Sequence, residues 1–121
     1  MSATIDQQIE QVQVELDELR EWISDYEAYQ RLKENKDFQQ VFTDGYFKKE
    51  AVRLVSLKAN PEFVFADDKQ MEFIDILILG VSGCQQYLEV LKQKAQLGYR
   101  SIEEQEDTLQ ELHAEEQGTL Q

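Results

Sequence analysis

The side chains that could carry out chemistry are few in this chain and lie far apart in the sequence. His113 is the only histidine and Cys84 the only cysteine. Cys84 falls on an apolar seam of a predicted helix, where a thiol most often serves as a small buried hydrophobic side chain. Because no histidine lies near it and no Cys or His cluster has the spacing of zinc ligands, neither a thiol nucleophile nor a zinc site is predicted.

Two other patterns match binding motifs only in part. Gly80 and Gly83 fall inside a predicted helix, and no lysine follows them as it does in a phosphate-binding P-loop. The acidic stretch 103–107 could bind a divalent ion loosely, but it lacks the alternating ligand spacing of an EF-hand loop. We therefore expect no enzymatic activity, no cofactor and no metal centre.

A strip of basic residues on one predicted helix is the remaining candidate site. This basic strip consists of Lys48, Lys49, Arg53 and Lys58. Such a strip could contact phosphate groups or an acidic partner. A solvated helix face accounts for the same residues without any ligand, and we favour that interpretation.

The negative charge of the chain is confined to its two ends. The 121 residues include 25 acidic and 12 basic side chains, which gives a net charge of −13. Residues 1–28 hold eight acids and one base, residues 98–121 hold seven and one, and residues 29–97 hold ten of each. Both acidic ends would repel a nucleic-acid backbone, so direct nucleic-acid binding is disfavoured. They could instead imitate the phosphates of a duplex and occupy the DNA-binding cleft of another protein.

Composition predicts an all-α protein. Five glycines and one proline are too few for the turns of a β-sandwich, and Glu, Gln, Leu and Lys favour long helices. The longest dense apolar stretch, FIDILILGVSGC, is about a dozen residues long and contains Asp75, which falls short of the roughly 18 residues of a membrane span. We therefore expect a soluble protein that makes no contact with a membrane, and the single cysteine fits a reducing compartment.

The clearest pattern is a heptad repeat that predicts a long helix over residues 4–34. Apolar residues recur at alternating spacings of four and three, which is typical of a coiled coil, and Thr4 with Gln7 forms a capping box at its start. A seam this narrow must be covered, either by a later helix of the same chain or by another chain, and the sequence leaves both open. We take this N-terminal seam as the predicted protein-interaction site: Ile5, Ile9, Val12, Leu16, Leu19, Ile23 and Tyr26.

The middle of the chain predicts a short helical hairpin. Asn35 breaks the first helix, and Asp37 is expected to cap a short helix that buries Phe38, Val41 and Phe42. Gly45 is expected to end that helix with a left-handed turn. A second helix then runs over residues 46–59 and stops at Asn60-Pro61.

A second long helix is predicted over residues 68–97, with Asp67 or Asp68 as its cap. Residues 73–79 are apolar almost all round the helix, which makes them the expected core. Gly98 is expected to end it, and Ser101 with Glu104 to cap an acidic C-terminal helix or tail. The predicted organisation is an acidic heptad helix (1–34), a charge-balanced helical core (35–97) and an acidic C-terminal arm (98–121).

The segment DFQQVFTDGYFKKEAVRLVSLKANP, residues 37–61, resembles the core of a group of small acidic helical proteins encoded by tailed bacteriophages. The resemblance covers about a fifth of the chain, or two fifths with the preceding helix, and does not extend beyond Pro61. It implies a phage gene product and, by association, a part in virion assembly, in the virion or the host cytoplasm. It rests on the strings Asp44-Gly45-Tyr46-Phe47, Glu50-Ala51, Arg53-Leu54-Val55 and Ala59-Asn60-Pro61.

Together these patterns predict a non-enzymatic phage structural or assembly protein that acts through helix–helix contacts. It would be a minor virion component, a scaffold-like factor or a connector accessory, with further copies of itself or virion proteins as partners. The alternative is a small acidic, DNA-mimicking inhibitor of a host defence or nucleic-acid enzyme. A third option is an accessory protein of DNA metabolism that uses Lys48, Lys49 and Arg53.

Overall fold

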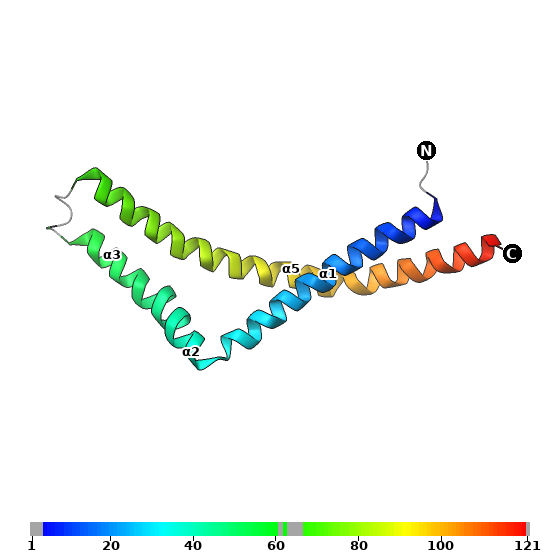
Figure 1. Cartoon of the computed structure of the whole chain (residues 1–121), viewed down its shortest axis with the longest axis horizontal. Helices are drawn as coiled ribbons and strands as arrows, with labels where there is room; N and C mark the ends of the chain where they lie inside the picture. Colours follow the sequence, from blue (N-terminus) through cyan, green and yellow to red (C-terminus); the bar gives the residue numbers. More distant parts are fainter. Residues whose placement is uncertain (1–3, 61, 63–66, 121) are drawn as a thin grey trace. The chain divides into compact units, whose positions relative to one another are not determined.

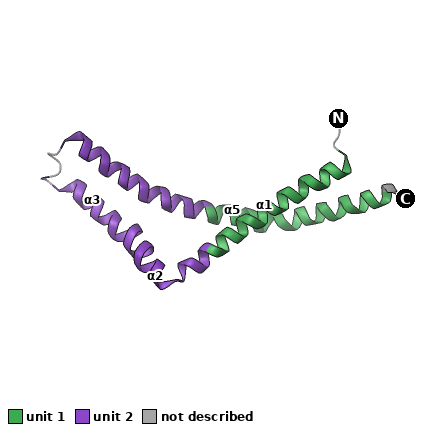
Figure 2. Cartoon of the chain, viewed as in Figure 1, with its two compact units in different colours: residues 1–28, 91–121 green, residues 29–90 purple. Residues whose placement is uncertain are grey.

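The computed structural model describes residues 4–60, 62 and 67–120, and every element in these ranges is helical (Figure 1). The all-α class and the two long helices are confirmed. The chain divides into two compact units, residues 1–28 with 91–121 (unit 1) and residues 29–90 (unit 2), coloured separately in Figure 2. The elements are α1 (Ile5–Lys33), α2 (Lys36–Phe38), η1 (Gln39–Glu50), α3 (Ala51–Ala59) and α5 (Asp68–Leu120).

Helix α1 begins with the predicted capping box. The Thr4 N–H donates to Gln7 Oε1 at 3.0 Å, and the Gln7 N–H donates to Thr4 Oγ1 at 3.2 Å. At the other end, Asn35 begins the next helix by accepting a hydrogen bond from the Phe38 N–H at 3.0 Å. The cap is therefore Asn35 and not Asp37, because a cap must precede the first helical turn that it satisfies.

The predicted hairpin in the middle of the chain is wrong, because α2, η1 and α3 follow one another without a break over residues 36–59. Gly45 makes no left-handed turn, and no described residue has a positive φ angle. Gly45 instead lies inside η1, a π-helix, where an added Cβ would lie 2.9 Å from the carbonyl oxygen of Gln40. The glycine fits because the wider π-helical turn brings that carbonyl close to its Cα.

The predicted end of the second long helix at Gly98 is also wrong. Asp67 caps α5 as expected, since its side chain accepts from the Gln70 N–H at 2.9 Å. The helix then continues through Gly98 to Leu120. Ser101 and Glu104 consequently lie within a helix, where they cap nothing, and the acidic C-terminal arm is the second half of α5.

Unit 1 is an antiparallel pair formed by α1 and the C-terminal half of α5. The Tyr99 hydroxyl of α5 donates to Glu27 of α1 at 3.0 Å, and Arg20 of α1 pairs with Glu106 of α5 at 3.4 Å. Residues later in α5 therefore contact residues earlier in α1, so the two helices run antiparallel. Apart from Ser101 and Thr108, the residues in the C-terminal half of α5 that are not exposed recur at spacings of four and three, like those of α1, which indicates a two-helix coiled coil. These α5 positions are Leu91, Ala95, Gly98, Ile102, Gln105, Leu109, Leu112 and Glu116.

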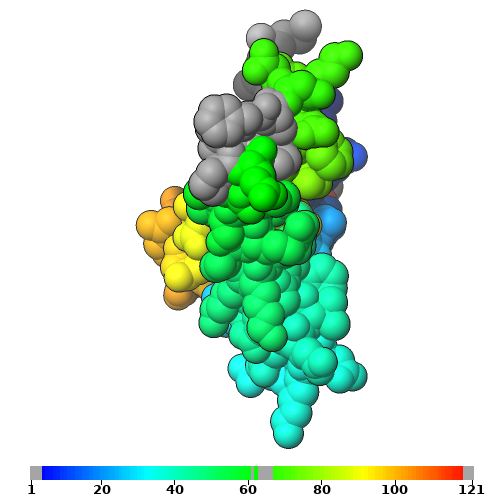
Figure 3. Space-filling model, turned by 90° about the vertical axis from the view of Figure 1, so that its left-hand side faces the viewer, coloured from blue at the N-terminus to red at the C-terminus, as the bar shows by residue number. Residues whose placement is uncertain are grey.

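Unit 2 packs the central helix against the first half of α5. Leu54 of α3 is 1% exposed, and Ile74 and Val81 of α5 are each 4% exposed. Lys58 Nζ lies 2.5 Å from Asp75 Oδ1 and joins the two helices near their connected ends. In the space-filling view the central helix runs from cyan to green, with the lighter green first turns of α5 beside its far end (Figure 3).

Candidate functional site

Unit 2 leaves much of its apolar surface uncovered. Residues 73–79 were predicted to be core, but Phe73 is 60%, Ile76 62% and Leu79 68% exposed. The prediction fails because the central helix covers only one face of this half of α5, so side chains on the other faces stay exposed. Ten of the thirteen exposed large hydrophobic side chains in the described residues belong to unit 2: Leu32, Val41, Phe42, Val52, Val55, Phe73, Ile76, Leu77, Leu79 and Tyr87.

The uncovered part of α5 also has a membrane-like length and composition. Within Asp68–Gly118 one stretch of this helix is long and apolar enough to cross a membrane, and 11% of that stretch is buried. Core helices of soluble proteins have the same length and composition. Those core helices are mostly buried, whereas this one is mostly exposed, so the surface lacks a covering element.

An apolar groove of about 460 Å³ runs between the central helix and the middle of α5. One wall is a row of aromatic rings in which Phe38 stacks on Phe42 at 5.2 Å, and Phe42 meets Tyr46 edge-on at 6.3 Å between ring centroids. Gly80 and Tyr87 belong to the opposite wall. Rings on a groove wall offer large apolar contact area at little conformational cost, which is typical of protein-binding surfaces.

The polar side-chain groups of this groove include the Tyr46 hydroxyl and the Cys84 thiol. Partial burial raises the pKa of Tyr46 above its ordinary value of about 10, and a hydrogen bond with the Cys84 side chain raises it further. Cys84 is exposed, so its predicted role as a buried hydrophobic residue is wrong. It faces the groove because it lies beside, and not on, the face of α5 that packs against the central helix.

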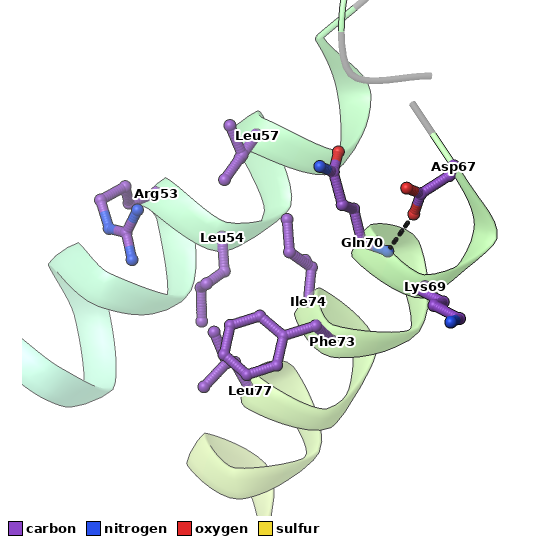
Figure 4. Close-up of a pocket in the computed structure, with 9 residues that line it drawn as sticks. All are labelled: Arg53, Leu54, Leu57, Asp67, Lys69, Gln70, Phe73, Ile74 and Leu77. Atoms are coloured by element: carbon purple, nitrogen blue, oxygen red, sulfur yellow. Dashed lines mark hydrogen bonds between the residues drawn. The ribbon is translucent and has the colours of Figure 1, made fainter. Parts of the chain in front are cut away.

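A second apolar groove of about 440 Å³ lies between α3 and the first turns of α5. In Figure 4, Leu54 and Leu57 of α3 point toward Phe73, Ile74 and Leu77 of α5. The charged and polar residues at the rim include Arg53, Asp67, Lys69 and Gln70. An apolar floor with a polar rim is the usual anatomy of a protein interface.

The basic strip is largely neutralised by acids of the same unit. Arg53 donates two hydrogen bonds to the Glu50 carboxylate, at 2.9 and 2.5 Å, which lowers the pKa of Glu50. Lys48 lies 3.6 Å from Asp44, and Lys58 pairs with Asp75. Lys49 alone of the strip has no acidic partner among the described residues. Little positive charge is therefore left to attract a phosphate.

The N-terminal seam lies in unit 1, where it faces the second half of α5. Ile9, Val12, Leu16 and Leu19 are buried, and Ile5, Ile23 and Tyr26 are half-buried. The sequence left open whether a later helix of the same chain or another chain covers this seam. In the structure, α5 of the same chain covers it. Most of the exposed large apolar side chains of the described residues lie in unit 2 instead.

The aromatic residues of the groove are the functional candidates that the sequence did not identify. Phe38 and Phe42 were expected to be buried with Val41, yet Val41 is 58% and Phe42 45% exposed. Phe38, Phe42 and Tyr46 recur every four residues, and this spacing was the sequence signal for an aromatic stripe on one helix face. The spacing does not distinguish a buried core from a binding surface, because both require the same apolar stripe.

The described residues contain no group of three or more His, Cys, Asp or Glu side chains arranged to hold a metal ion. His113 lies exposed in the second half of α5, and the acidic stretch 103–107 belongs to the same helix. No protein-family model, no curated protein and no solved structure matches the chain.

Proposed function

We propose that this protein is a non-enzymatic assembly protein that acts through helix–helix contacts made by the apolar face of unit 2. The observation that carries the proposal is the concentration of exposed apolar side chains in that unit. Ten side chains of roughly 100 Å² exposed area each amount to on the order of 1,000 Å². The five that line the two grooves account for about half of this area, and an exposed apolar patch of several hundred Å² on a monomeric protein often marks an interaction site.

The shape of this face suits a helix as the partner. The two apolar grooves follow one another along α5, from Phe73 and Leu77 to Gly80 and Tyr87. An elongated groove between two helices receives the apolar stripe of a third helix, with anchors every three or four residues. The partner we propose is therefore a helical protein segment and not a small molecule.

The resemblance to tailed-phage proteins supports a place for this contact in virion assembly. The segment that carries the resemblance, residues 37–61, includes the whole of η1 and α3. Tyr46 and Phe47 from its Gly-Tyr-Phe string line one groove, and Leu54 from its Arg-Leu-Val string lines the other. We place the protein in the virion or the host cytoplasm, as a minor virion component, scaffold-like factor or connector accessory.

The test is co-sedimentation with purified capsid, portal and tail components of the phage that encodes the chain. We expect the protein to sediment with one of these components, and Phe73→Glu to abolish the association. Val14→Glu is the matched control, because Val14 is also exposed (58%) but lies on α1 in unit 1. A protein that stays free of every component would overturn the proposal.

Unit 1 gives one specific reason to keep the acidic inhibitor as a second candidate. It holds fifteen acids and four bases, a net charge of −11, whereas unit 2 holds ten acids and eight bases. Its two helices are paired, and most of the carboxylates lie on exposed positions, so the charges sit on an ordered surface. This candidate is supported if the wild-type chain binds a DNA-binding enzyme and the complex dissociates at high salt concentration. Retention that is unchanged in high salt would contradict it.

A further inference from the structure

The first half of α5 carries two apolar seams, and only one of them is buried. Ile74 and Val81 belong to the buried seam, each at 4% exposure. The second seam is displaced to one side of the helix and repeats at spacings of four, three, four and three. This exposed seam consists of Phe73, Leu77, Gly80, Cys84 and Tyr87.

A seam with heptad spacing predicts a helix packed along its whole length. Among the described residues it is covered only in its middle, where Tyr46 lies against Gly80 and Cys84, whereas Phe73 is 60% and Tyr87 62% exposed. Phe73 and Leu77 line the groove beside α3, and Gly80, Cys84 and Tyr87 line the groove beside α2 and η1. The exposed seam therefore lines both grooves along α5.

We propose that a second copy of this chain covers the exposed seam, so that two copies of unit 2 form a two-fold symmetric four-helix bundle. The inference rests on the proposed function, because it names the partner of the same apolar face. Two helices that share one apolar face complete a core when the same face of another copy meets it. A two-fold contact uses the same patch on both chains, and it is the commonest arrangement of soluble oligomers.

The groove side of unit 2 can supply the apolar centre of a dimer interface. Five of its ten exposed large apolar side chains line the two grooves and expose on the order of 500 Å², and a standard interface buries about 800 Å² on each partner with its polar rim included. A single partner helix would cover one strip of this surface. A second two-helix unit is wide enough to cover the seam together with the aromatic wall that includes Phe42 and Tyr46.

The charge of unit 2 also favours a second copy. Its eight bases and ten acids nearly cancel, and Arg53–Glu50 and Lys58–Asp75 are already paired within the chain. Two such faces meet without strong repulsion, and neither calls for a partner of opposite charge. Unit 1, at −11, repels its own copy, so self-association through unit 2 and not unit 1 is expected.

A lipid bilayer is the other apolar medium that could cover α5. Asp75 lies within the apolar segment and is paired with Lys58 of α3. Insertion of this part of α5 alone would break that pair and leave a carboxylate in hydrocarbon, which costs several kcal/mol or forces its protonation. A protein surface needs no such change, because the pair lies about half exposed at the edge of unit 2.

The first measurement is the mass of the full chain by light scattering, from micromolar to hundreds of micromolar concentration. We expect twice the 14.2 kDa of one chain at high concentration and dissociation on dilution. Phe73→Glu and Tyr87→Glu place a carboxylate on the exposed seam and should each weaken the dimer at least tenfold. Val14→Glu should leave it intact, and circular dichroism checks that all variants keep their helix content.

The second measurement identifies the face. Cys84 is the only cysteine, so the rate of its alkylation reports on the exposed seam alone. The rate should fall as the wild type dimerises and should stay high in Tyr87→Glu. Raising the salt concentration should strengthen the dimer, because it screens the repulsion between the two copies of unit 1.

A strict monomer at every concentration would overturn the second copy as the partner. If that monomer still bound a purified virion component, only this inference would fail and the proposed function would stand. A dimer that bound no virion component would leave the inference standing and remove the proposed function. Binding to phosphatidylcholine vesicles by a monomer, with Cys84 protected, would assign the face to lipid. A dimer that kept Cys84 reactive would place the contact elsewhere and also overturn the inference.

Discussion

Gly98 of α5 lies so close to Ile23 of α1 that a methyl group on Gly98 would make an unusually tight contact with the isoleucine side chain. A Cβ at Gly98 would lie 3.1 Å from Ile23 Cγ1 and 3.2 Å from the carbonyl oxygen of Leu19. The Ile23 side chain can rotate aside, but the Leu19 carbonyl is held in the backbone of α1. The glycine therefore allows the two helices of unit 1 to approach closely.

We expect Gly98→Ala to be less stable than the matched variant Gly83→Ala. Both changes replace a glycine within α5 by a better helix former, a gain of about 1 kcal/mol. At Gly83 nothing lies within 4 Å of the added Cβ, so the gain is kept. At Gly98 the contact with Leu19 pushes the helices apart and offsets it. Urea unfolding at low protein concentration measures the difference, and equal stabilities would contradict the prediction.

The fold of unit 1 was predictable because its signals are local. The spacing from Ile5 to Tyr26 marks one face of a helix, and Thr4 with Gln7 marks its first turn. What the sequence left undecided was which helix covers the seam. α5 covers the seam only because this helix continues past Gly98. A glycine often ends a helix, but Gly98 instead makes a close contact with Ile23 and Leu19 of α1.

The candidate site was less predictable for a related reason. Apart from Asp75, the stretch 73–79 is apolar, and composition alone assigns it to a core. Whether it is one depends on how many helices surround it, and unit 2 supplies only one other. Gly45 was misinterpreted in the same way, because its closeness to Gln40 arises only in the π-helix and has no sequence signal of its own.

We expect Leu16→Ala to lower the free energy of unfolding by about 2–5 kcal/mol. Leu16 is 1% exposed in the centre of the N-terminal seam, so the change leaves a cavity between α1 and α5. Val14→Ala, on the same helix at 58% exposure, should be neutral or slightly stabilising. Chemical denaturation of both variants measures this. Similar losses in the two would mean that α5 does not cover the seam in solution.

We expect Gly45→Ala to disrupt the π-helical segment η1. The added Cβ would lie 2.9 Å from the Gln40 carbonyl oxygen, a distance that real Cβ atoms essentially never show, so the backbone must shift. The shift should move Phe42 and Tyr46 out of register and speed amide hydrogen exchange over residues 39–50. Gln40→Ala is the control, because it adds an alanine to the same segment and keeps the backbone oxygen. Unchanged exchange in Gly45→Ala would contradict the assignment of a π-helix here.

We expect the ionisation of Tyr99 to lower the stability of the protein at alkaline pH. Its hydroxyl donates to Glu27 Oε1 at 3.0 Å, and this bond, with partial burial, raises the pKa of Tyr99 above its ordinary value of about 10. Because the folded state holds the proton more tightly than the unfolded state, the stabilisation is complete below about pH 10. It is lost as the pH rises through the folded-state pKa.

Thermal unfolding between about pH 8 and pH 11 tests this. The wild type should lose more stability over that range than Tyr99→Phe, which has no proton to release at this position. Part of the loss should remain in the variant, because the pKa of Tyr46 is also raised. Glu27→Gln keeps an acceptor but removes the negative charge, so it should also reduce the loss. If Tyr99→Phe followed the wild type at every pH, the bond between Tyr99 and Glu27 would not contribute to the stability of unit 1.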